Sequence, residues 1–313
     1  MTPETPAIGA AAPDLTGRRV LVTGVTSGLG TATAELFARA GAEVLLAGRN
    51  RDKLAQVRQQ MRRDLGPALG DRELRAIVVD LADLSSVRHA AAEVSGLGPL
   101  DVLVNNAGVM ALGPERTVDG FDVQMGTNHF GPFALTGLLL PALVSSGDAR
   151  VVTIASQAHR LAREAPLEDP RVPVVRHRPW RVYSASKLAN LLFTAELDRR
   201  AREAGLPLRA TAAHPGWTAT GLMSGSRHGS GGGIGSILVG AFGLLGQSPE
   251  EGAAATVMAA TADLPGGAYV GPSGPLEMRG LPHVVGGSRL ARDAWAADRL
   301  WQLSEEATGV TYP

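Results

Sequence analysis

The sequence predicts a single doubly wound α/β domain built on a parallel sheet of about seven strands. In the first two-thirds of the chain, short β-branched apolar runs alternate with longer helix-forming segments. The apolar runs do not alternate with polar residues, as is typical of strands buried on both faces. A length of 313 residues also suits one large domain better than two. Because strands separated by helices pair in parallel through right-handed crossovers, helices should cover both faces of the sheet.

The expected elements follow one another in a regular order. Strands are expected at residues 19–22, 44–47, 76–79, 102–104, 151–155 and 208–213. Helices are expected at residues 31–40, 51–65, 84–94, 121–144 and 183–204. No repeat and no linker-like stretch divides the chain, so we expect residues 14–313 to form one domain. Residues 1–13, rich in Pro, Thr and Ala, are expected to be a disordered tail.

Composition argues against several classes of function. The formal net charge is zero and the sequence pI is about 7.1, which speaks against nucleic acids and anionic membranes as partners. There is no cysteine, so disulfides, thiolate nucleophiles and cysteine metal sites are excluded, and the seven histidines lack metal-ligand spacing. No run reaches the roughly 18 apolar residues of a membrane span, and the N-terminal residues lack a signal-peptide pattern. We therefore expect a cytoplasmic protein without a metal.

A glycine-rich turn joins the first expected strand to the first expected helix. Residues 23–30 read T-G-V-T-S-G-L-G. Glycine permits tight turning and lets the backbone approach a pyrophosphate at a helix N-terminus, where free N–H groups and the dipole favour anions. Three glycines alone are as typical of a structural turn as of a dinucleotide site. Their position favours the dinucleotide site, because doubly wound sheets bind dinucleotides at the first strand-to-helix connection. The spacing is G-x-x-x-G-x-G instead of the common G-x-G-x-x-G.

Further motifs follow in an order that resembles the short-chain dehydrogenase/reductase family over nearly the whole chain. After the family's glycine turn come Asp80-Leu81, Asn105-Asn106-Ala107-Gly108, Asn128, Ser156, Tyr183-Ser184-Ala185-Ser186-Lys187 and Pro215-Gly216-Trp217-Thr218-Ala219-Thr220. The branch of retinol dehydrogenases and protochlorophyllide reductases is the most similar, through residues 47–50, 187–192 and 303–306. The resemblance implies a Rossmann-type fold, a nicotinamide dinucleotide and hydride transfer.

Tyr183 and Lys187 are four residues apart, so on a helix they share one face. A free phenol has a pKa near 10, too high for a proton shuttle at neutral pH, and a nearby ammonium lowers it by favouring the phenolate. A bare Y-x-x-x-K is usually an ordinary pair on an exposed helix face. Beside the other motifs, the resemblance implies that Tyr183 is the general acid and base and that Lys187 holds the nicotinamide ribose.

Ser156 and Asn128 complete the catalytic set that the resemblance implies. Ser156 follows an expected strand at the carboxyl edge of the sheet, where its hydroxyl can hold the substrate oxygen; the alternative is a serine that caps the next segment. Asn128 lies inside an expected helix, an unfavourable place for asparagine. In the family this residue binds a water that links the lysine to solvent, and the alternative is an asparagine on the helix surface.

The end of the second expected strand bears on the choice of cofactor. NAD enzymes place an acidic residue there to bind the ribose 2′-hydroxyl, whereas an arginine accommodates a 2′-phosphate. Here Gly48 occupies the acidic position and Arg49 follows, so we expect NADP(H), with a solvated surface arginine as the alternative. By resemblance, the cofactor should contact Thr23, Gly24, Thr26, Ser27, Gly28, Leu29, Gly30, Arg49, Asn50, Asp80, Leu81, Asn106, Ala107, Gly108, Tyr183, Lys187, Pro215, Gly216, Trp217, Thr218 and Thr220.

The segment at 221–247 is expected to be a substrate lid, because a glycine cluster at 229–233 precedes an apolar stretch at 234–245. An apolar lid, together with Trp180 and Trp217 as walls, would suit a hydrophobic carbonyl or alcohol, and core packing is the alternative for each tryptophan alone. A core helix or a subunit interface are the alternatives for this segment. The basic insertion at 171–181 would hinder the helix pairing of many relatives, so the sequence commits to no oligomer.

The function predicted is an NADP(H)-dependent oxidoreductase of the alcohol dehydrogenase or ketoreductase type. Two other functions share the cofactor site. Epimerases and isomerases usually have a T-G-x-x-G-x-x-G turn and a larger C-terminal substrate domain, and this chain has neither. Non-catalytic NADP-binding sensors tend to lose the Tyr/Lys pair, which is intact here.

Overall fold

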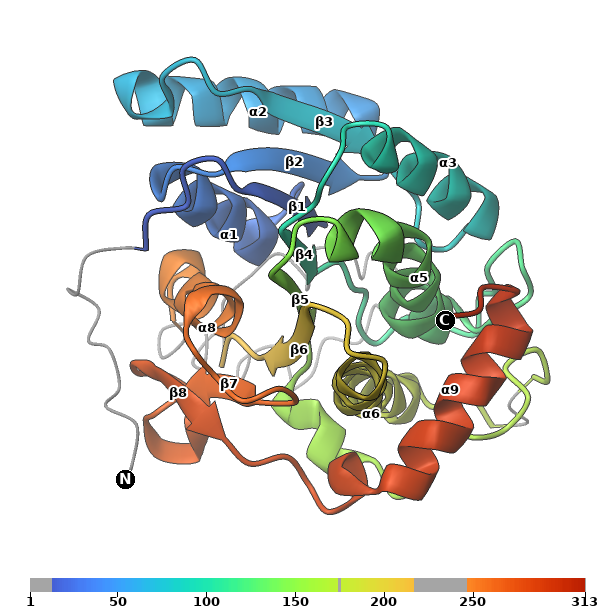
Figure 1. Cartoon of the computed structure of the whole chain (residues 1–313). Coiled ribbons are helices and arrows are strands. Elements are labelled where there is room, and N and C mark those ends of the chain that lie inside the picture. The colour runs from blue at the N-terminus through green and yellow to red at the C-terminus, as the bar shows by residue number, and fades with distance from the viewer. Residues whose placement is uncertain (1–12, 174–175, 217–246, 313) are drawn as a thin grey trace, which may run out of the picture.

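The computed structural model describes residues 13–173, 176–216 and 247–312, and within them eight strands form one sheet (Figure 1). The strands are β1 (Arg19–Thr23), β2 (Glu43–Gly48), β3 (Leu74–Val78), β4 (Val102–Asn105), β5 (Ala149–Ile154), β6 (Leu208–Ala213), β7 (Tyr269–Pro272) and β8 (Pro282–Val285). Their order is β3-β2-β1-β4-β5-β6-β7-β8. The first seven strands pair in parallel, as the sequence predicts, and β8 adds an antiparallel edge beside β7.

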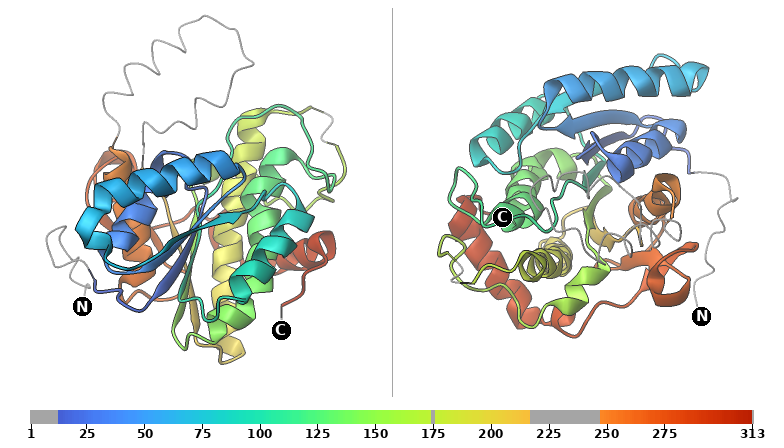
Figure 2. Two further views of the ribbon diagram at one scale, coloured as in Figure 1. Left: turned by 90° about the horizontal axis from the view of Figure 1, so that it is seen from above. Right: turned by 180° about the vertical axis from the view of Figure 1, so that it is seen from behind.

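Helices cover both faces of this sheet (Figures 1 and 2). They are α1 (Gly28–Arg39), α2 (Arg51–Leu65), α3 (Leu84–Ser95), α4 (Val123–Met125), α5 (Gly131–Val144), α6 (Pro179–Glu203), α8 (Pro249–Thr261) and α9 (Ala294–Thr308). One apolar cluster joins the strands to α1, α2 and α8, and a second joins them to α3, α5, α6 and α9. Along β1, Val20 and Val22 belong to the first cluster and Leu21 to the second. The strand is therefore apolar without alternation because both of its faces are buried.

The strand order reverses between β1 and β4, because chain order runs outward from β1 to β3 on one side and from β4 to β7 on the other. In doubly wound sheets, the crevice beyond the carboxyl ends of the strands at such a reversal binds ligands. The glycine turn and the segments after β4 and β5 all leave the sheet at this edge. The topology thus brings the sequence motifs together, which makes the fold a Rossmann-type α/β domain.

The helix expected at 121–144 is interrupted. A short α4 passes into a π-helical turn, η2 (Gly126–Phe130), before α5 begins. A Cβ atom on Gly131 would lie 2.2 Å from the carbonyl oxygen of Leu81, so the chain at this junction packs closer to the segment after β3 than an alanine would permit. π-turns within helices frequently mark functional sites, and this one carries Asn128.

The C-terminal region closes the face that holds α5 and α6. The indole of Trp301 on α9 is buried and packs edge-on against Phe133 of α5, with ring centroids 5.2 Å apart. The hydroxyl of Tyr312 donates to the carbonyl oxygen of Phe133 at 2.7 Å. α9 therefore covers the outer sides of α5 and α6, as Figure 1 shows. Among the described helices, none has the length and apolar character to cross a membrane.

Candidate active site

The glycine turn and the segment after β4 form one rigid unit. The Oγ atom of Thr23 accepts hydrogen bonds from the backbone N–H groups of Asn106 and Ala107, both at 3.0 Å. The Asn106 side chain donates to the Thr23 carbonyl oxygen at 2.6 Å. Gly24 has a φ of +74°, and a Cβ on it would lie 2.7 Å from the Cα of Ala107. A Cβ on Gly30 would lie 2.3 Å from the Gly24 carbonyl oxygen, so both positions require glycine.

The geometry at the start of α1 fits a bound pyrophosphate. Ser27 is the N-cap residue, yet within the described residues its side chain caps none of the first backbone N–H groups. The unpaired N–H groups of a helix N-terminus attract anions. The residues present thus fit the phosphates of a dinucleotide.

The expected adenosine end of the site lies beyond β2 and β3. Gly48 ends β2, and Arg49 and Asn50 follow it at the exposed surface. The Asn50 side chain caps α2 by accepting from the N–H of Lys53 at 2.9 Å. Asp80 lies two residues beyond the end of β3, and its carboxylate accepts from the N–H of Ala82 at 2.9 Å. Asn50 and Asp80 therefore shape the rim of the crevice through local turns, whereas the Arg49 side chain makes no such bond with another described residue.

The structure brings Ser156, Tyr183 and Lys187 together at the carboxyl end of β5. Ser156 lies two residues beyond the end of β5 and is half-buried, and Tyr183 and Lys187 lie in the first turns of α6. Burial raises the pKa of Tyr183, and the side-chain hydrogen bond with Ser156 opposes that shift. The ammonium of Lys187 is buried 5.8 Å from the centre of the Tyr183 ring. Ser156 also caps the following 3₁₀ turn, η3 (Gln157–Leu161), by accepting from the N–H of Ala158 at 3.2 Å.

The electrostatics of this pair differ from the sequence-based expectation. The pKa of Tyr183 lies above its ordinary value, not below it, because burial disfavours the phenolate. The Nζ atom of Lys187 donates to the Ile154 carbonyl oxygen at 2.9 Å. Burial lowers the pKa of Lys187 itself to about 8.

Asn128 is buried, with an exposed fraction of 1%, so it is not a surface asparagine. Its Oδ1 atom accepts from the N–H of Val109 at 2.8 Å. Its Nδ2 atom donates to the Val109 carbonyl oxygen and to the Ser186 hydroxyl, both at 2.9 Å. The side chain therefore ties the segment after β4 to the helix that carries Tyr183, a role that the helical pattern alone did not indicate.

Of the remaining predicted residues, the structure describes those before position 217 and Gln247. Pro215 and Gly216 follow β6 at the same sheet edge, and Gly216 has a φ of +67°. Trp217, Thr218 and Thr220 lie outside the described residues, as does the expected lid except for Gln247. Trp180 is 54% exposed and stands edge-on to Tyr183, with ring centroids 5.9 Å apart.

Several polar residues at this edge escaped the sequence reasoning. They are Gln157, His159, His214, Gln247 and Glu277. Gln157 directly follows Ser156, and His214 directly precedes Pro215, so adjacency to a motif was a usable signal for both. Glu277 carried no such signal, because its side chain bonds with residues 63 and 120 positions away.

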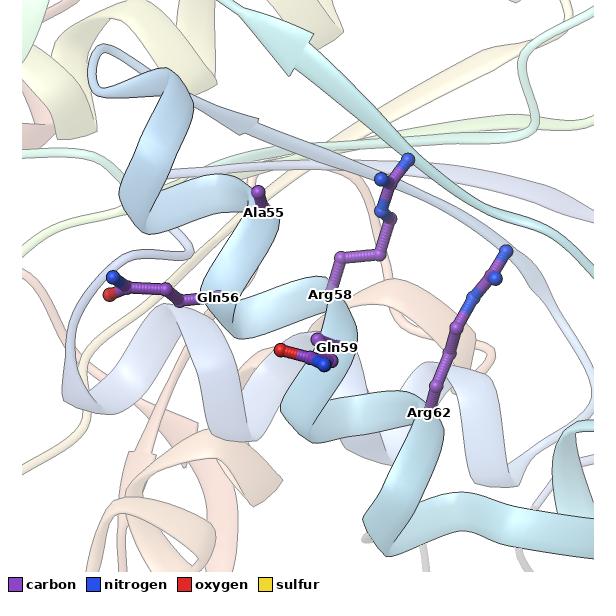
Figure 3. A pocket seen from close by; sticks show the side chains of 5 residues that line it. All are labelled: Ala55, Gln56, Arg58, Gln59 and Arg62. Carbon is purple, nitrogen blue, oxygen red and sulfur yellow. The ribbon is translucent and has the colours of Figure 1, made fainter.

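A hollow of about 390 Å³ lies elsewhere, on the exposed side of α2. Figure 3 shows Arg58 and Arg62, which line it together with Ala55, Gln56 and Gln59. All five side chains come from one helix, and none belongs to the glycine turn or to the Tyr183 segment. This hollow is therefore separate from the candidate active site.

Comparison with known proteins agrees with the geometry. The family model for short chain dehydrogenase matches residues 18–167. Retinol dehydrogenase 14 of Mus musculus is 37% identical over 308 residues, which cover 94% of this chain and 86% of that protein. The crystal structure of an uncharacterized protein from Mycobacterium paratuberculosis is 43% identical, with a TM-score of 0.78 over 97% of this chain and 98% of that one.

A further solved structure contains a cofactor. It is described as an NAD(P) dependent gluconate 5-dehydrogenase from Beutenbergia cavernae, with NADP bound at low occupancy. It is 29% identical to this chain, with a TM-score of 0.61 over 79% of this chain and 91% of that one. The glycine turn, the strand order and these similarities lead to one assignment. This chain belongs to the short-chain dehydrogenase/reductase family of NAD(P)-dependent oxidoreductases, in the branch that includes the retinol dehydrogenases.

Proposed function

We propose that this protein is an NADP(H)-dependent oxidoreductase that moves a hydride between the nicotinamide and a carbonyl or alcohol carbon of a hydrophobic substrate. The observation that carries the proposal is the meeting of Ser156, Tyr183 and Lys187 beside the glycine turn. We further infer that the catalytic domain runs from residue 14 to the C-terminus.

The cofactor would lie along the carboxyl edge of the sheet. The N-terminus of α1 would bind its phosphates, and Arg49 would meet the adenosine end. Asn106 and Gly108, after β4, and Pro215 and Gly216, after β6, would line the nicotinamide half. The bound dinucleotide supplies or accepts the hydride.

The protein's own residues would handle the proton. In the reducing direction, the Tyr183 hydroxyl donates its proton to the substrate oxygen as the carbonyl carbon receives the hydride. Ser156 holds that oxygen beside the phenol, where it already interacts with Tyr183. The resulting phenolate needs a nearby positive charge, and the Lys187 ammonium is the buried cation at this position. In the oxidising direction, the phenolate takes the proton back.

Gly48 and Arg49 support NADP(H) over NAD(H). β2 ends without an acidic side chain that would repel a 2′-phosphate, and the guanidinium of Arg49 lies exposed just beyond it. Arginine binds phosphate oxygens through paired charge-assisted hydrogen bonds.

An exposed apolar side chain beside Tyr183 supports a hydrophobic substrate. Trp180 is 54% exposed and stands edge-on to the phenol of Tyr183. Pockets for small molecules are lined mainly by apolar and aromatic side chains. The relative named for retinol, an apolar alcohol, points to the same class of substrate.

A cofactor-consumption assay tests this function. NADPH oxidation is followed across apolar ketones, aldehydes and quinones, and NADP⁺ reduction across the matching alcohols. The wild-type chain should turn over at least one apolar compound, and Tyr183→Phe should lower kcat by roughly 10²–10⁴-fold while still binding NADPH.

Tyr312→Phe is the matched control, because it removes a phenol that bonds to the Phe133 carbonyl oxygen on α5 and to none of the proposed catalytic residues, and it should leave kcat near the wild-type value. Full activity in Tyr183→Phe, or no turnover of any compound by the wild type, would overturn the proposal.

A further inference from the structure

We propose that His214 and Glu277 are positioning residues, which lock the Pro215-Gly216 turn to the segment that carries Ser156. The inference rests on the proposed function, because it uses the roles assigned there to Ser156 and to the Pro215-Gly216 turn. Its basis is a chain of hydrogen bonds through the loop between β7 and β8, residues 273–281, here called the β7–β8 loop.

His214 is held in one protonation state by the Gly216 N–H and the Glu277 carboxylate. Its Nε2 atom also lies 3.3 Å from Gln157 Nε2, which is a second donor to the same carboxylate. Only 1% of the surface of His214 is exposed. Its Nδ1 atom accepts from the backbone N–H of Gly216 at 3.2 Å and therefore carries no proton. The proton must lie on Nε2, which donates to the Glu277 carboxylate at 3.0 Å. A second proton on Nδ1 would clash with the N–H of Gly216. Burial also disfavours the doubly protonated ring and lowers the pKa of His214 to about 3.

Glu277 extends this link to the catalytic serine segment. The Nε2 atom of Gln157, the residue after Ser156, donates to the same Glu277 oxygen that His214 contacts. The guanidinium of Arg160 lies 3.5 Å from the other carboxylate oxygen, and it also donates to Gln157 Oε1 at 2.7 Å. One carboxylate therefore binds groups from both sides of the proposed reaction centre.

A second histidine fixes the backbone of Ser156 itself. His159 accepts from the N–H of Ser288 at 3.0 Å through Nε2, so its proton lies on Nδ1. That Nδ1–H donates to the Ser156 carbonyl oxygen at 2.7 Å. Ser288 lies just beyond β8, so the β7–β8 region holds the serine segment through both its backbone and its neighbour's side chain.

The β7–β8 loop also contacts the Pro215-Gly216 turn directly. The Gln247 side chain donates to the Pro215 carbonyl oxygen at 2.8 Å and accepts from the N–H of Gly280 at 3.0 Å. A Cβ on Gly216 would lie 2.4 Å from the carbonyl oxygen of Met278. The turn has little freedom to shift relative to this loop.

The backbone of the loop is strained where it presents the carboxylate. Leu276 and Glu277 have φ values of +55° and +53°, in the left-handed region that residues other than glycine seldom adopt. Such a conformation persists only where surrounding contacts hold it. The contacts of Glu277 with His214, Gln157 and Arg160 are the ones that hold it here.

We expect this link to control how closely the nicotinamide approaches the substrate. The Pro215-Gly216 turn borders the nicotinamide half, and Ser156 holds the substrate oxygen, so the link sets the distance over which the hydride moves. A displacement of about 1 Å can cost roughly a hundredfold in rate. Within the described residues, no hydrogen bond joins Arg49, at the adenosine end, to this network, so the affinity for the cofactor should change much less than kcat.

The test compares Glu277→Ala, Glu277→Gln, His214→Asn and the double variant His214→Asn/Glu277→Ala. Asn at 214 can keep the bond to Gly216 but is too short to reach Glu277. Glu277→Ala and His214→Asn should each lower kcat by roughly tenfold to a hundredfold at saturating NADPH, with the NADPH Kd changed by less than about threefold. Glu277→Gln keeps an acceptor oxygen and should recover part of the loss. The double variant should be little worse than either single variant, because both break the same link.

Two readouts are independent of turnover. Long-range ¹H–¹⁵N spectra should show His214 as the neutral Nε2–H tautomer in the wild type. In Glu277→Ala the N–H of Gly216 still fixes this tautomer, but the Nε2–H resonance should shift because its bond to the carboxylate is lost. The emission of bound NADPH, which reports the surroundings of the nicotinamide, should change in the same variant. If Glu277→Ala does not fold, Glu277→Gln and His214→Asn carry the test.

Glu43→Gln is the matched control. Glu43 is also a half-buried carboxylate in an ion pair, with Arg19, but it begins β2 at the opposite edge of the sheet. It should leave kcat and the NADPH emission unchanged. Unchanged kcat and NADPH emission in the His214 and Glu277 variants, with an unshifted His214 Nε2–H resonance in Glu277→Ala, would overturn the positioning role, as would additive losses in the double variant. An active Tyr183→Phe would instead refute the proposed function and leave the His214 Nε2–H resonance and the emission results to decide the link.

Discussion

Lys187 and Asn190 donate to the same acceptor. The Nζ atom of Lys187 and the Nδ2 atom of Asn190 lie 2.9 and 3.0 Å from the carbonyl oxygen of Ile154, the last residue of β5. If Lys187 turns toward a bound ribose, Asn190 still satisfies this buried carbonyl oxygen. The lysine can therefore change partners without leaving an unpaired backbone group, which would cost about 1–3 kcal/mol.

Replacing Lys187 by methionine should stabilise the cofactor-free protein while it abolishes turnover. Burial lowers the pKa of Lys187 from 10.5 to about 8, so folding disfavours its ammonium at neutral pH. Methionine removes that cost and keeps the packing, and we expect a gain of about 1–3 kcal/mol in the free energy of unfolding at pH 7. The gain should be complete below pH 8 and fade toward pH 10.5, where the unfolded lysine also loses its proton.

Denaturant unfolding at several pH values measures this effect. Lys53→Met, at an exposed position on α2, should change the free energy of unfolding little. A Lys187→Met protein that is less stable than the wild type at pH 7 would contradict the prediction.

Replacing Arg49 by alanine should weaken NADP(H) binding alone. Loss of a charge-assisted contact with the 2′-phosphate should cost about 1.5–3 kcal/mol, or roughly tenfold to a hundredfold in affinity. Titration with both cofactors checks this, because NAD(H) lacks the phosphate and its affinity should not fall. Arg58→Ala, on the exposed side of α2, serves as the control. Equal losses for the two cofactors would remove Arg49 from the 2′-phosphate site.

Replacing Gly30 by alanine should damage the dinucleotide turn. The added Cβ would lie 2.3 Å from the Gly24 carbonyl oxygen and 2.6 Å from Asn106 Nδ2, so the turn must open. We expect the free energy of unfolding to fall by about 1–3 kcal/mol and NADPH binding to weaken. Gly96→Ala is the matched control, since its nearest contact is an ordinary 3.4 Å. Wild-type binding by Gly30→Ala would show that the turn tolerates a side chain.

The buried His129 should contribute to acid destabilisation. Burial lowers its pKa from 6.5 to about 3, so in this pH range the unfolded state binds a proton that the folded state does not. Its contribution to stability is therefore complete above pH 6.5 and is lost as the pH falls toward 3, at about 1.4 kcal/mol per pH unit.

Between pH 6 and 4, His129→Phe should reduce the slope of the free energy of unfolding against pH by the equivalent of about one bound proton. Phenylalanine suits a site among Phe130, Phe133 and Phe193, and Ser304 keeps its bond to the Leu300 carbonyl oxygen. Denaturant unfolding across the pH range measures the slope. His89→Gln, at an exposed position, should leave it unchanged. An identical slope in His129→Phe would show that another group dominates acid unfolding.

Most of the sheet could be predicted from the sequence, because strands buried on both faces consist of continuous runs of apolar residues. β6 spans Leu208–Ala213, as expected, and the strands before it differ from the expected bounds by two residues or fewer at each end. β8 lacks such a continuous apolar run. It reads Pro-His-Val-Val, with Val284 45% exposed, because an edge strand is buried less and is specified mainly by its pairing with β7.

The division between sequence and tertiary structure is sharpest at the site. By itself, the sequence determined the family, the carboxyl edge where the motifs meet and the shared helix face of Tyr183 and Lys187, because these depend on local spacing and on the order of strands. Only the tertiary structure decided that burial raises the pKa of Tyr183 and lowers that of Lys187. It also decided that Glu277 meets His214 and Gln157 across 63 and 120 positions. Desolvation and long-range hydrogen bonds depend on which distant segments pack together, and no local pattern of residues records that.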